Sequence, residues 1–424
     1  MTNKITLTLY LTAVCFANQA FASDFNLPFV SSSGLGVSYA NWATATDDAS
    51  TAFTNPAGLV DLPGQQVMWN ALGIVGTAQY KGTSTTPGPA VPFPFPINQS
   101  GTAHSNIEAF MPSFYYSGSL LDQLSWGFHF TAPFGLGTDY GMGSIVRYAS
   151  TKSKVIALDM GPSFGLRLNE YVSVGAGVDA VHLKFTLSNA YGPPLSMAGD
   201  AFVENSLSGW GVTWHGGVMV KPNKQTRIGF SFNGRVPVDT TGHSHLIMSS
   251  GQKMILHNQK SSAALPARAQ LSIQHAWNQR WTSMFTAFYT HWKTFERIVL
   301  QNTLLPNGQT TVVNIPFNYE NTMDYSFGSS YQITERILLR GGIEFYDQPS
   351  NQWDRGVADP IGKATILTAG MQYKVNDKLK FDMGLGHSFF KDVPAKLTNP
   401  LTSLNGILKT QTTTFGAQVS WQFA

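Results

Sequence analysis

Alternation of apolar and polar residues is the dominant pattern of this chain, and it is clearest near the C-terminal end. Within 412–423, every second residue from Phe415 to Phe423 is apolar, and the residues between them are small or polar. Side chains of a β-strand point alternately to its two faces, so this segment predicts a strand with one apolar and one polar face. The same pattern occurs at 379–389 and at 337–345, where Arg340 and Glu344 fall on the polar face.

Turn signals divide the alternating segments into hairpins. We predict six tight turns, at 121–123, 168–170, 222–224, 278–280, 334–336 and 376–378. Long polar or Pro- and Gly-rich loops are predicted at 81–104, 189–208, 238–265, 300–316, 347–362 and 392–409. Six hairpins, an opening strand near 65–80 and a closing strand at the C-terminal end together give fourteen strands. Short turns on one side, long loops on the other and an even strand number are typical of bacterial outer-membrane barrels.

Composition supports a barrel that crosses a membrane. Charged residues make up 12% of the chain, against about 25% in soluble domains. After the N-terminal segment, no apolar run approaches the roughly 20 residues that a membrane-spanning helix needs. The expected fold class is therefore all-β, a 14-stranded antiparallel transmembrane β-barrel that is closed because an open sheet edge is unfavourable in lipid.

Residues 1–22 predict a secretory signal peptide. Lys4 precedes an apolar run at 5–16, and Ala20 and Ala22 stand where a cleavage site needs small residues. Cys15, the only cysteine of the chain, lies inside this segment. The mature chain is therefore expected to contain no disulfide and no thiol chemistry. Removing Lys4 from the 27 basic residues leaves 26 against 24 acidic residues, a charge of +2 that does not indicate nucleic-acid binding.

The segment 23–63 lacks the alternation and is rich in Ser, Gly, Ala and Thr. It carries the motifs SSSGLG at 31–36 and NPAGL at 55–59, with an acidic pair, Asp47 and Asp48, between them. Both motifs resemble the N-terminal hatch of the outer-membrane long-chain fatty acid transporter family, which also includes uptake channels for aromatic hydrocarbons. Three later motifs resemble the same family in the same order: PFGLGTDY at 133–140, LPARAQLSIQHAW at 265–277 and LLRGGIEFYDQP at 338–349.

The resemblance implies a hatch at 23–63 that plugs a barrel at 64–424. It implies uptake of hydrophobic compounds, with long-chain fatty acids the broader expectation and monoaromatic hydrocarbons the alternative. The ligand would bind in a lumenal pocket, the hatch would rearrange, and the ligand would leave through a side opening at a kinked third strand. The resemblance also implies a monomer in the outer membrane of a Gram-negative bacterium, in contact with lipid and lipopolysaccharide. No cofactor or metal ion is expected.

Candidate ligand-binding residues are mainly aromatic. The resemblance implies that Phe25, near the mature N-terminus, reaches into the ligand pocket. Phe93, Phe95 and Phe134 could line an apolar landing groove for the ligand, or they could be ordinary loop-packing residues. Arg147 is the candidate for binding a carboxylate, because a guanidinium group can hold one through two hydrogen bonds.

Three other arginines compete with that basic residue. Arg167, Arg227 and Arg340 lie on predicted lumenal faces, and we expect them in internal ion pairs with residues such as Asp382 or Glu344.

The hatch and its gate are predicted from two short motifs. Asn55, Pro56 and Ala57 predict a tight turn, which Asn-Pro explains by itself. The resemblance adds that this turn packs against an inward bend of the third strand.

The third predicted strand contains residues that interrupt a regular ladder. Pro133 cannot donate a backbone hydrogen bond, and it is followed by Gly135 and Gly137. Such a cluster favours a kink or a bulge over a regular strand. The alternative is that Pro133 begins an extracellular loop. A gap at this point would allow an apolar ligand to enter the bilayer without crossing water.

Two rival classes fit less well, an enzyme and a general porin. An enzyme would need a nucleophile beside a histidine, and none of the 10 His lies in a recognisable nucleophile motif. His243 and His245 alone are a weak indication of a metal site. A general porin needs no plug, whereas this chain has a segment of about 40 residues that resembles one. We therefore expect a transporter and not an enzyme.

Overall fold

The computed structural model describes residues 30–86, 96–192, 195–196, 198–295, 297–351, 353 and 355–423. The predicted signal peptide lies outside this part of the chain, as do the candidate residues Phe25, Phe93 and Phe95.

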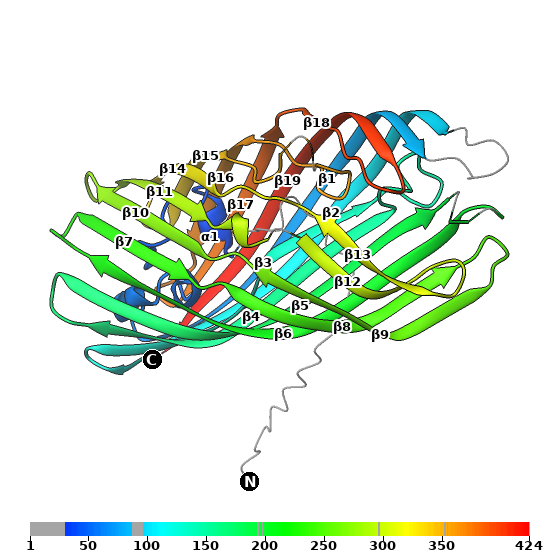
Figure 1. Cartoon of the computed structure of the whole chain (residues 1–424). Coiled ribbons are helices and arrows are strands. Elements are labelled where there is room, and N and C mark those ends of the chain that lie inside the picture. The colour runs from blue at the N-terminus through cyan, green and yellow to red at the C-terminus, as the bar shows by residue number, and fades with distance from the viewer. Residues whose placement is uncertain are drawn as a thin grey trace, which may run out of the picture.

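A closed antiparallel barrel forms the wall of the protein (Figure 1). The predicted count of fourteen strands is confirmed when β7 with β8 and β9 with β10 are each taken as one bent wall strand. The first strand closes the barrel by pairing with the last, from Gln65↔Phe423 to Thr85↔Ser403. The wall elements are β1 (Gln65–Thr86), β2 (Ile97–Leu121), β3 (Leu124–Asp139), β4 (Lys152–Arg167), β5 (Val172–Tyr191), β6 (Ala201–Val220), β7 (Thr226–Asn233), β8 (Val236–Ile247), β9 (Lys253–Leu265), β10 (Arg268–Ala276), β11 (Trp281–Thr290), β14 (Thr322–Gln332), β15 (Ile337–Tyr346), β16 (Ala364–Lys374), β17 (Leu379–Phe390) and β19 (Ser403–Phe423).

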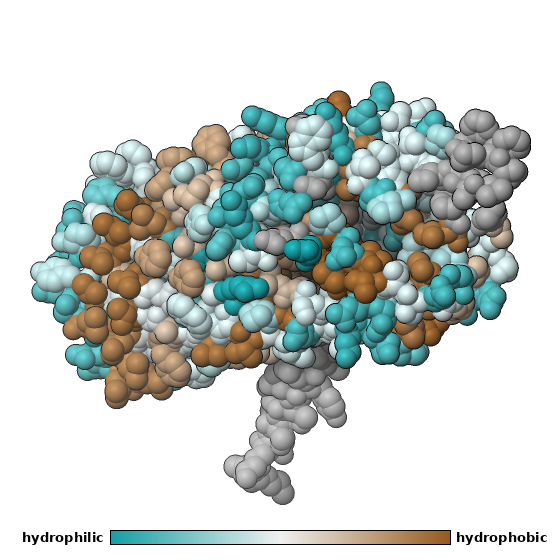
Figure 2. All heavy atoms as spheres, viewed as in Figure 1, coloured by the Kyte–Doolittle hydropathy of each residue, from teal (hydrophilic) through white to brown (hydrophobic). Residues whose placement is uncertain are grey.

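The alternation in the sequence corresponds to the two faces of this wall. In β19, Phe415 and Trp421 point outward with half of their surface exposed, whereas Gln418 and Ser420 are buried. All six tight turns lie where they are predicted, between consecutive wall strands. Figure 2 shows the apolar outer surface at the left of the view, over β7, β10 and β11. Exposed apolar side chains of these strands include Phe230, Leu271, Ile273, Trp281 and Tyr289.

Several predicted loops are in fact extended hairpins, and this corrects the sequence analysis. The segment 238–265, predicted as a loop, is almost entirely strand, since it forms most of β8 and all of β9. The segment 300–316 lies in a hairpin of β12 (Arg297–Leu304) and β13 (Thr310–Pro316). β18 (Val393–Ala395) pairs with β19 inside another predicted loop. Polar composition predicted loops here because a hairpin that extends into water needs no apolar outer face.

Three short helical elements inside the barrel form the hatch (Figure 1). They are α1 (Ser32–Leu35), α2 (Thr51–Thr54) and the 3₁₀ helix η1 (Pro56–Asp61). We use "hatch" below for the described residues 30–63. Among the described residues, no helix has the length and apolar character needed to cross a bilayer.

The inner face of the wall is mainly polar on the C-terminal strands and mixed on the N-terminal ones. Inward positions of β15, β17 and β19 carry buried polar residues such as Arg340, Asp382 and Gln418. Inward positions of β1 to β6 carry large apolar residues such as Met111 and Phe185 as well as buried polar ones such as Asp179. These apolar residues join the hatch and the β11–β14 connection in a single cluster. It includes Trp42, Phe53, Met111, Phe134, Phe185, Phe288, Trp292, Phe295 and Tyr319.

Candidate functional site: the hatch seat and the kinked third strand

One acidic residue, Asp48, ties the hatch together and to the barrel. Its carboxylate accepts hydrogen bonds from Ser33 Oγ at 2.6 Å and Ser50 Oγ at 2.6 Å, both within the hatch. It also accepts one from Gln418 Nε2 of β19 at 2.9 Å. Because Asp48 is 94% buried, these donors replace the water that a carboxylate would otherwise need. A cavity of only about 10 Å³ lies beside this network, too small for an organic ligand.

The Asn55-Pro56-Ala57 turn is held by the side chain of its first residue. Asn55 Oδ1 accepts a hydrogen bond from the Ala57 backbone N–H at 3.2 Å and so caps η1. Its Nδ2 donates to Ala43 O at 2.7 Å and to Val218 O of β6 at 3.3 Å. The predicted turn is therefore present, and one amide side chain joins it to the hatch core and to the wall.

A row of wall glycines provides the seat for this turn. Gly165, Gly175 and Gly217 are paired with one another across β4, β5 and β6. A Cβ atom at each of them would lie 2.4 Å from the turn, against Pro56 O, Ala57 N and Asn55 Oδ1 respectively. Only glycine permits so close an approach of two backbones.

The expected packing of the turn against the bend in the third strand stays a prediction, and the glycine row is a contact that was not predicted. The turn rests on β4 to β6, and both α2 and η1 lie against β3, where a Cβ at Gly127 would meet Ala52 Cβ at 2.7 Å and Leu59 Cδ2 at 3.1 Å. The sequence shows these glycines, but which inward positions face the hatch depends on the register of distant strands.

Two of the competing arginines, Arg167 and Arg340, form internal ion pairs as predicted, whereas Arg227 donates a hydrogen bond to a neutral residue. Arg340 Nη1 lies 2.5 Å from Asp382 Oδ1, and both side chains are buried. Arg167 Nη2 lies 3.3 Å from the hatch residue Asp61. Arg227 Nη1 donates to Thr46 Oγ1 of the hatch at 2.6 Å. Two of these arginines therefore fasten the hatch to the wall.

Arg147 lies outside the lumen, in the connection between β3 and β4. Its Nε donates to Asp200 Oδ2 at 2.6 Å, and its Nη1 donates to Gln99 Oε1 at 2.9 Å and to Ser144 O at 3.0 Å. Its Nη2 donates to the hydroxyl of Tyr148 at 2.8 Å. A ligand carboxylate at Arg147 would have to compete with Asp200, so this anchor stays a prediction.

The kink in the third strand is confirmed. The β3–β4 register shifts by one residue between Thr131 and Phe134, around Pro133. The ladder between β3 and β2 ends at Phe130, within the described part of both strands. Beyond it, Ser113 Oγ of β2 lies 3.3 Å from Thr131 Oγ1, and Ser105 Oγ of β2 accepts a hydrogen bond from the Asp139 backbone N–H at 2.8 Å. Gly135 and Gly137 are buried in this section, where β3 keeps its ladder to β4 but has none to β2.

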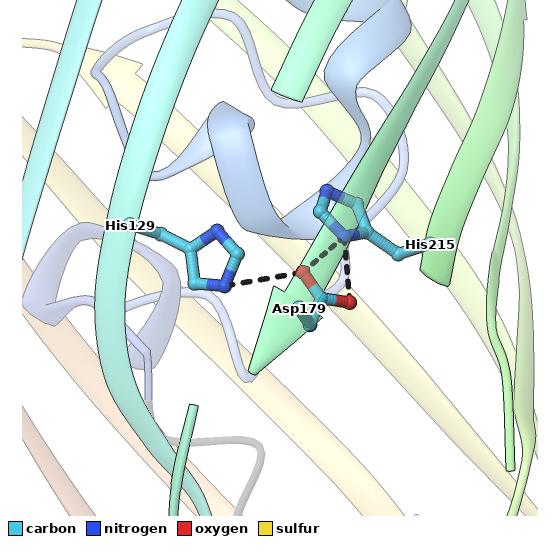
Figure 3. Close-up of side chains that lie close together, drawn as sticks. All are labelled: His129, Asp179 and His215. Carbon is cyan, nitrogen blue, oxygen red and sulfur yellow. Dashed lines mark hydrogen bonds and ion pairs between the residues drawn. The ribbon is translucent and has the colours of Figure 1, made fainter. Parts of the chain in front are cut away.

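Phe134 joins the kink to the hatch through a buried arginine. The guanidinium of Arg268 lies 4.8 Å from the ring centre of Phe134 and 5.9 Å from that of Phe53 in α2. The ring of Phe53 lies 5.0 Å from that of His129. His129 belongs to a buried group with Asp179 and His215 on the wall behind α2 (Figure 3). Sequence analysis did not single out this group, because its members lie on three different strands.

An open groove of about 370 Å³ lies near the outer end of the apolar cluster. Its lining consists of Arg235, Lys293, Thr294 and Arg297. Phe295 lies between Lys293 and Arg297 in the chain, turns inward, is 6% exposed and belongs to the apolar cluster. The groove thus places positive charge at the edge of an apolar interior.

Comparison with known proteins decides the family. Residues 13–423 match the family of outer membrane protein transport proteins (OMPP1/FadL/TodX). The chain belongs to this family. An OMPP1/FadL/TodX protein is an outer-membrane transporter of hydrophobic compounds, so the predicted class and the predicted Gram-negative outer-membrane location are confirmed.

Individual relatives of this FadL/TodX-family chain are distant but cover nearly its whole length. Outer membrane protein P1 of Haemophilus influenzae is 26% identical, over 93% of this chain and 92% of that protein. A long-chain fatty acid transport protein of Escherichia coli O6:H1 is 24% identical, over 91% and 92% respectively.

Solved structures show the same fold. The crystal structure of a Pseudomonas aeruginosa FadL homologue superposes with a TM-score of 0.83 at 20% identity, covering 95% of this chain and 100% of that one. The toluene transporter TbuX of Ralstonia pickettii gives 0.67 at 17% identity, covering 92% and 98%.

Proposed function

We propose that this transporter takes up long-chain fatty acids across the outer membrane. The observation that carries the proposal is the apolar cluster that runs from the basic groove to the hatch and the kinked strand. A fatty acid combines a long alkyl chain with a carboxylate, and this interior offers an apolar path with positive charge at its outer edge. Curated relatives named as long-chain fatty acid transport proteins support the same substrate class.

The entrance of this path is the groove with three basic residues. A carboxylate at Arg235, Lys293 or Arg297 would leave the alkyl chain free to follow Phe295 inward. Lys293 has one neighbouring acid, with its Nζ 3.0 Å from Glu320 Oε2, in an exposed ion pair. Exposed ion pairs contribute little, about 0–1 kcal/mol, so a ligand carboxylate can replace Glu320 at low cost.

The proposed exit is the section of β3 beyond Phe130, which is paired with β4 but not with β2. Beyond Phe130 no ladder joins β3 to β2. Among the described residues, the hydrogen bonds between these two strands here each involve a side chain. Opening this section disrupts no strand pairing, whereas opening a paired seam would break several backbone hydrogen bonds. Movement of α2 would free Phe53 and Phe134, which lie at the inner side of the kink.

Uptake of monoaromatic hydrocarbons is the second candidate. The structural neighbour TbuX is described as a toluene transporter, and a hydrocarbon would use the same apolar path. A hydrocarbon has no charge, so the three basic residues of the groove would contribute nothing to its binding. The groove therefore favours a carboxylate.

Binding to delipidated, detergent-purified protein tests the substrate. Native mass spectrometry with oleate and with toluene should show saturable oleate binding. Arg235→Gln with Arg297→Gln should weaken it by about tenfold or more, as expected for the loss of one charge-assisted hydrogen bond. Arg147→Ala tests the other predicted anchor, and Arg280→Gln in a tight turn is the matched control. Toluene binding without oleate binding would transfer the assignment to hydrocarbons, and binding of neither would refute the path.

A reversible disulfide tests the exit. The hydroxyl oxygens of Ser113 and Thr131 are 3.3 Å apart in the section where β3 is not paired with β2, and no cysteine lies outside the predicted signal peptide. Oxidised Ser113→Cys/Thr131→Cys should bind oleate normally but lose uptake into cells, and a reducing agent should restore it. Each single variant serves as a control. Unchanged uptake with the disulfide formed would exclude this exit.

A further inference from the structure

A buried polar group on the wall contacts the hatch directly. His129 of β3, Asp159 of β4, Asp179 of β5 and His215 of β6 lie on adjacent strands, and each is at least 95% buried. His129 Nε2 lies 3.2 Å from Asp159 Oδ1 and 3.5 Å from Asp179 Oδ1. Arg268 of β10, also buried, interacts electrostatically with both carboxylates. The family function described above makes no use of these side chains.

Both ring nitrogens of His215 face hydrogen-bond acceptors. Nδ1 lies 2.7 Å and 2.9 Å from the two carboxylate oxygens of Asp179 (Figure 3). Nε2 lies 3.0 Å from the backbone carbonyl oxygen of Ala52 in α2. A neutral imidazole has only one N–H and cannot donate to both, and a carbonyl oxygen can only accept. The His215–Asp179 pair therefore holds one proton more than a neutral histidine beside an ionised carboxylate.

His129 does not compete for that proton. Its Nε2 faces Asp159, whereas its Nδ1 is buried without a hydrogen-bond partner among the described residues. A second proton on this ring would be a buried donor with no acceptor, which is unfavourable. His129 is therefore neutral, with its hydrogen on Nε2.

The formal charges then cancel. Asp159 and Asp179 contribute two negative charges, and protonated His215 and Arg268 contribute two positive charges. Elements packed against His215 add no further charge. α2 presents Ala52 and Phe53 to it, and the residue of β7 paired with His215 is the neutral Asn233. Loss of the proton would leave a net negative charge in a buried site, which is costly.

We propose that this proton is a latch that holds the hatch closed. With it, His215 bridges Asp179 in the wall and Ala52 in the hatch. Without it, one nitrogen lone pair must face an acceptor, so the contact to Ala52 or to Asp179 is lost. The latch lies beside Phe53, which meets Arg268 and, through it, Phe134 at the kink. Rising pH therefore weakens the attachment of α2 next to the proposed exit, whichever hydrophobic ligand is transported.

A metal ion fits this arrangement less well than a proton. The donor atoms of His129, Asp179 and His215 lie within 4.8 Å of one another, as they would around an ion. With Arg268 counted in both cases, a divalent ion in place of the proton would leave the group with a net charge of +1, whereas the proton makes it neutral. Charge balance therefore favours the proton.

Thiol labelling of the hatch tests the latch. Thr54 in α2 is 4% exposed and its hydroxyl has no hydrogen-bond partner among the described residues, so Thr54→Cys is a mild substitution. The rate of maleimide labelling is measured from pH 5 to pH 9 in this protein and in the same protein with Asp179→Asn. The side-chain amide that Asp179→Asn introduces can donate to a neutral His215, which keeps both bonds without the extra proton. The ratio of the two rates removes the pH dependence of thiol chemistry.

The expected result is a ratio, parent over Asp179→Asn, that rises with pH by up to about tenfold per unit, the slope for one proton. His215→Ala should label fast at every pH, and His182→Ala, on the neighbouring strand β5 and outside the group, should behave like the parent. Heat-modifiable migration in electrophoresis verifies that each barrel is folded. A ratio that stays constant with pH would overturn the proposal. So would one equivalent of a transition metal in the purified protein by elemental analysis.

Discussion

Gly175→Ala is the sharpest test of how the hatch is seated. The added Cβ would lie 2.4 Å from Ala57 N and from Pro56 C, whereas ordinary contacts begin at 3.4 Å. Both atoms belong to backbone, so no side chain can rotate away. The hatch must therefore move by about 1 Å, the difference between these distances. Such a shift would lengthen the 3.3 Å contact from Asn55 Nδ2 to Val218 O beyond hydrogen-bonding range.

The energetic effect follows from the cost of overpacking, about 1–3 kcal/mol. Applied to the closed hatch, this cost lowers the ratio of closed to open protein by roughly 5- to 140-fold. Single-channel recording in planar bilayers measures this ratio as the time without conductance divided by the time with conductance. Gly341→Ala is the matched control, because its Cβ would have only one neighbour, 4.0 Å away. If Gly175→Ala stays as silent as the control, the glycine row does not seat the hatch.

Three further substitutions test the polar attachments. Arg340→Met should destabilise the folded barrel by about 3–5 kcal/mol, because it leaves Asp382 buried without its cation. Urea unfolding in vesicles measures this loss, and adding Asp382→Leu to the same chain should recover much of it. Asp48→Asn should speed thiol labelling of the hatch about five- to tenfold, because a neutral amide accepts these hydrogen bonds more weakly; equal rates would show that the charge is unimportant. Burial and a hydrogen bond to Asp200 raise the pKa of Tyr148 above its ordinary value, so this loop contact persists through the pH range in which an ordinary tyrosine ionises and is lost only at higher pH. The ultraviolet difference between wild type and Tyr148→Phe measures that titration.

The barrel wall was predictable because its determinants are local. Alternation over ten or more residues identifies β17 and β19, and short polar turns such as 376–378 locate the hairpins. Pro133 likewise announces the kink, since it cannot join the ladder. Each of these signals depends only on neighbours in sequence.

The hatch seat and the latch were not predictable in the same way. Gly165, Gly175 and Gly217 form a row only once the registers of three strands are known. His129 and His215 are 86 residues apart in the numbering, and only the curvature of the wall brings both against α2. The segment 238–265 was also mistaken for a loop, because the outer face of β8 is polar although Val236 and Val238 are buried on its inner face.

The barrel wall is complete without the hatch: in the described chain, no ladder of the wall includes a residue before Gln65, and β1 closes directly on β19. The plug is therefore a separate module in the sense used by protein engineers. A different plug could be grafted ahead of β1 without redesigning any strand pairing, provided that it presents a backbone turn to the glycine row. In evolutionary terms, the same independence allows the plug and the barrel to diverge at different rates, with the glycines as the shared constraint.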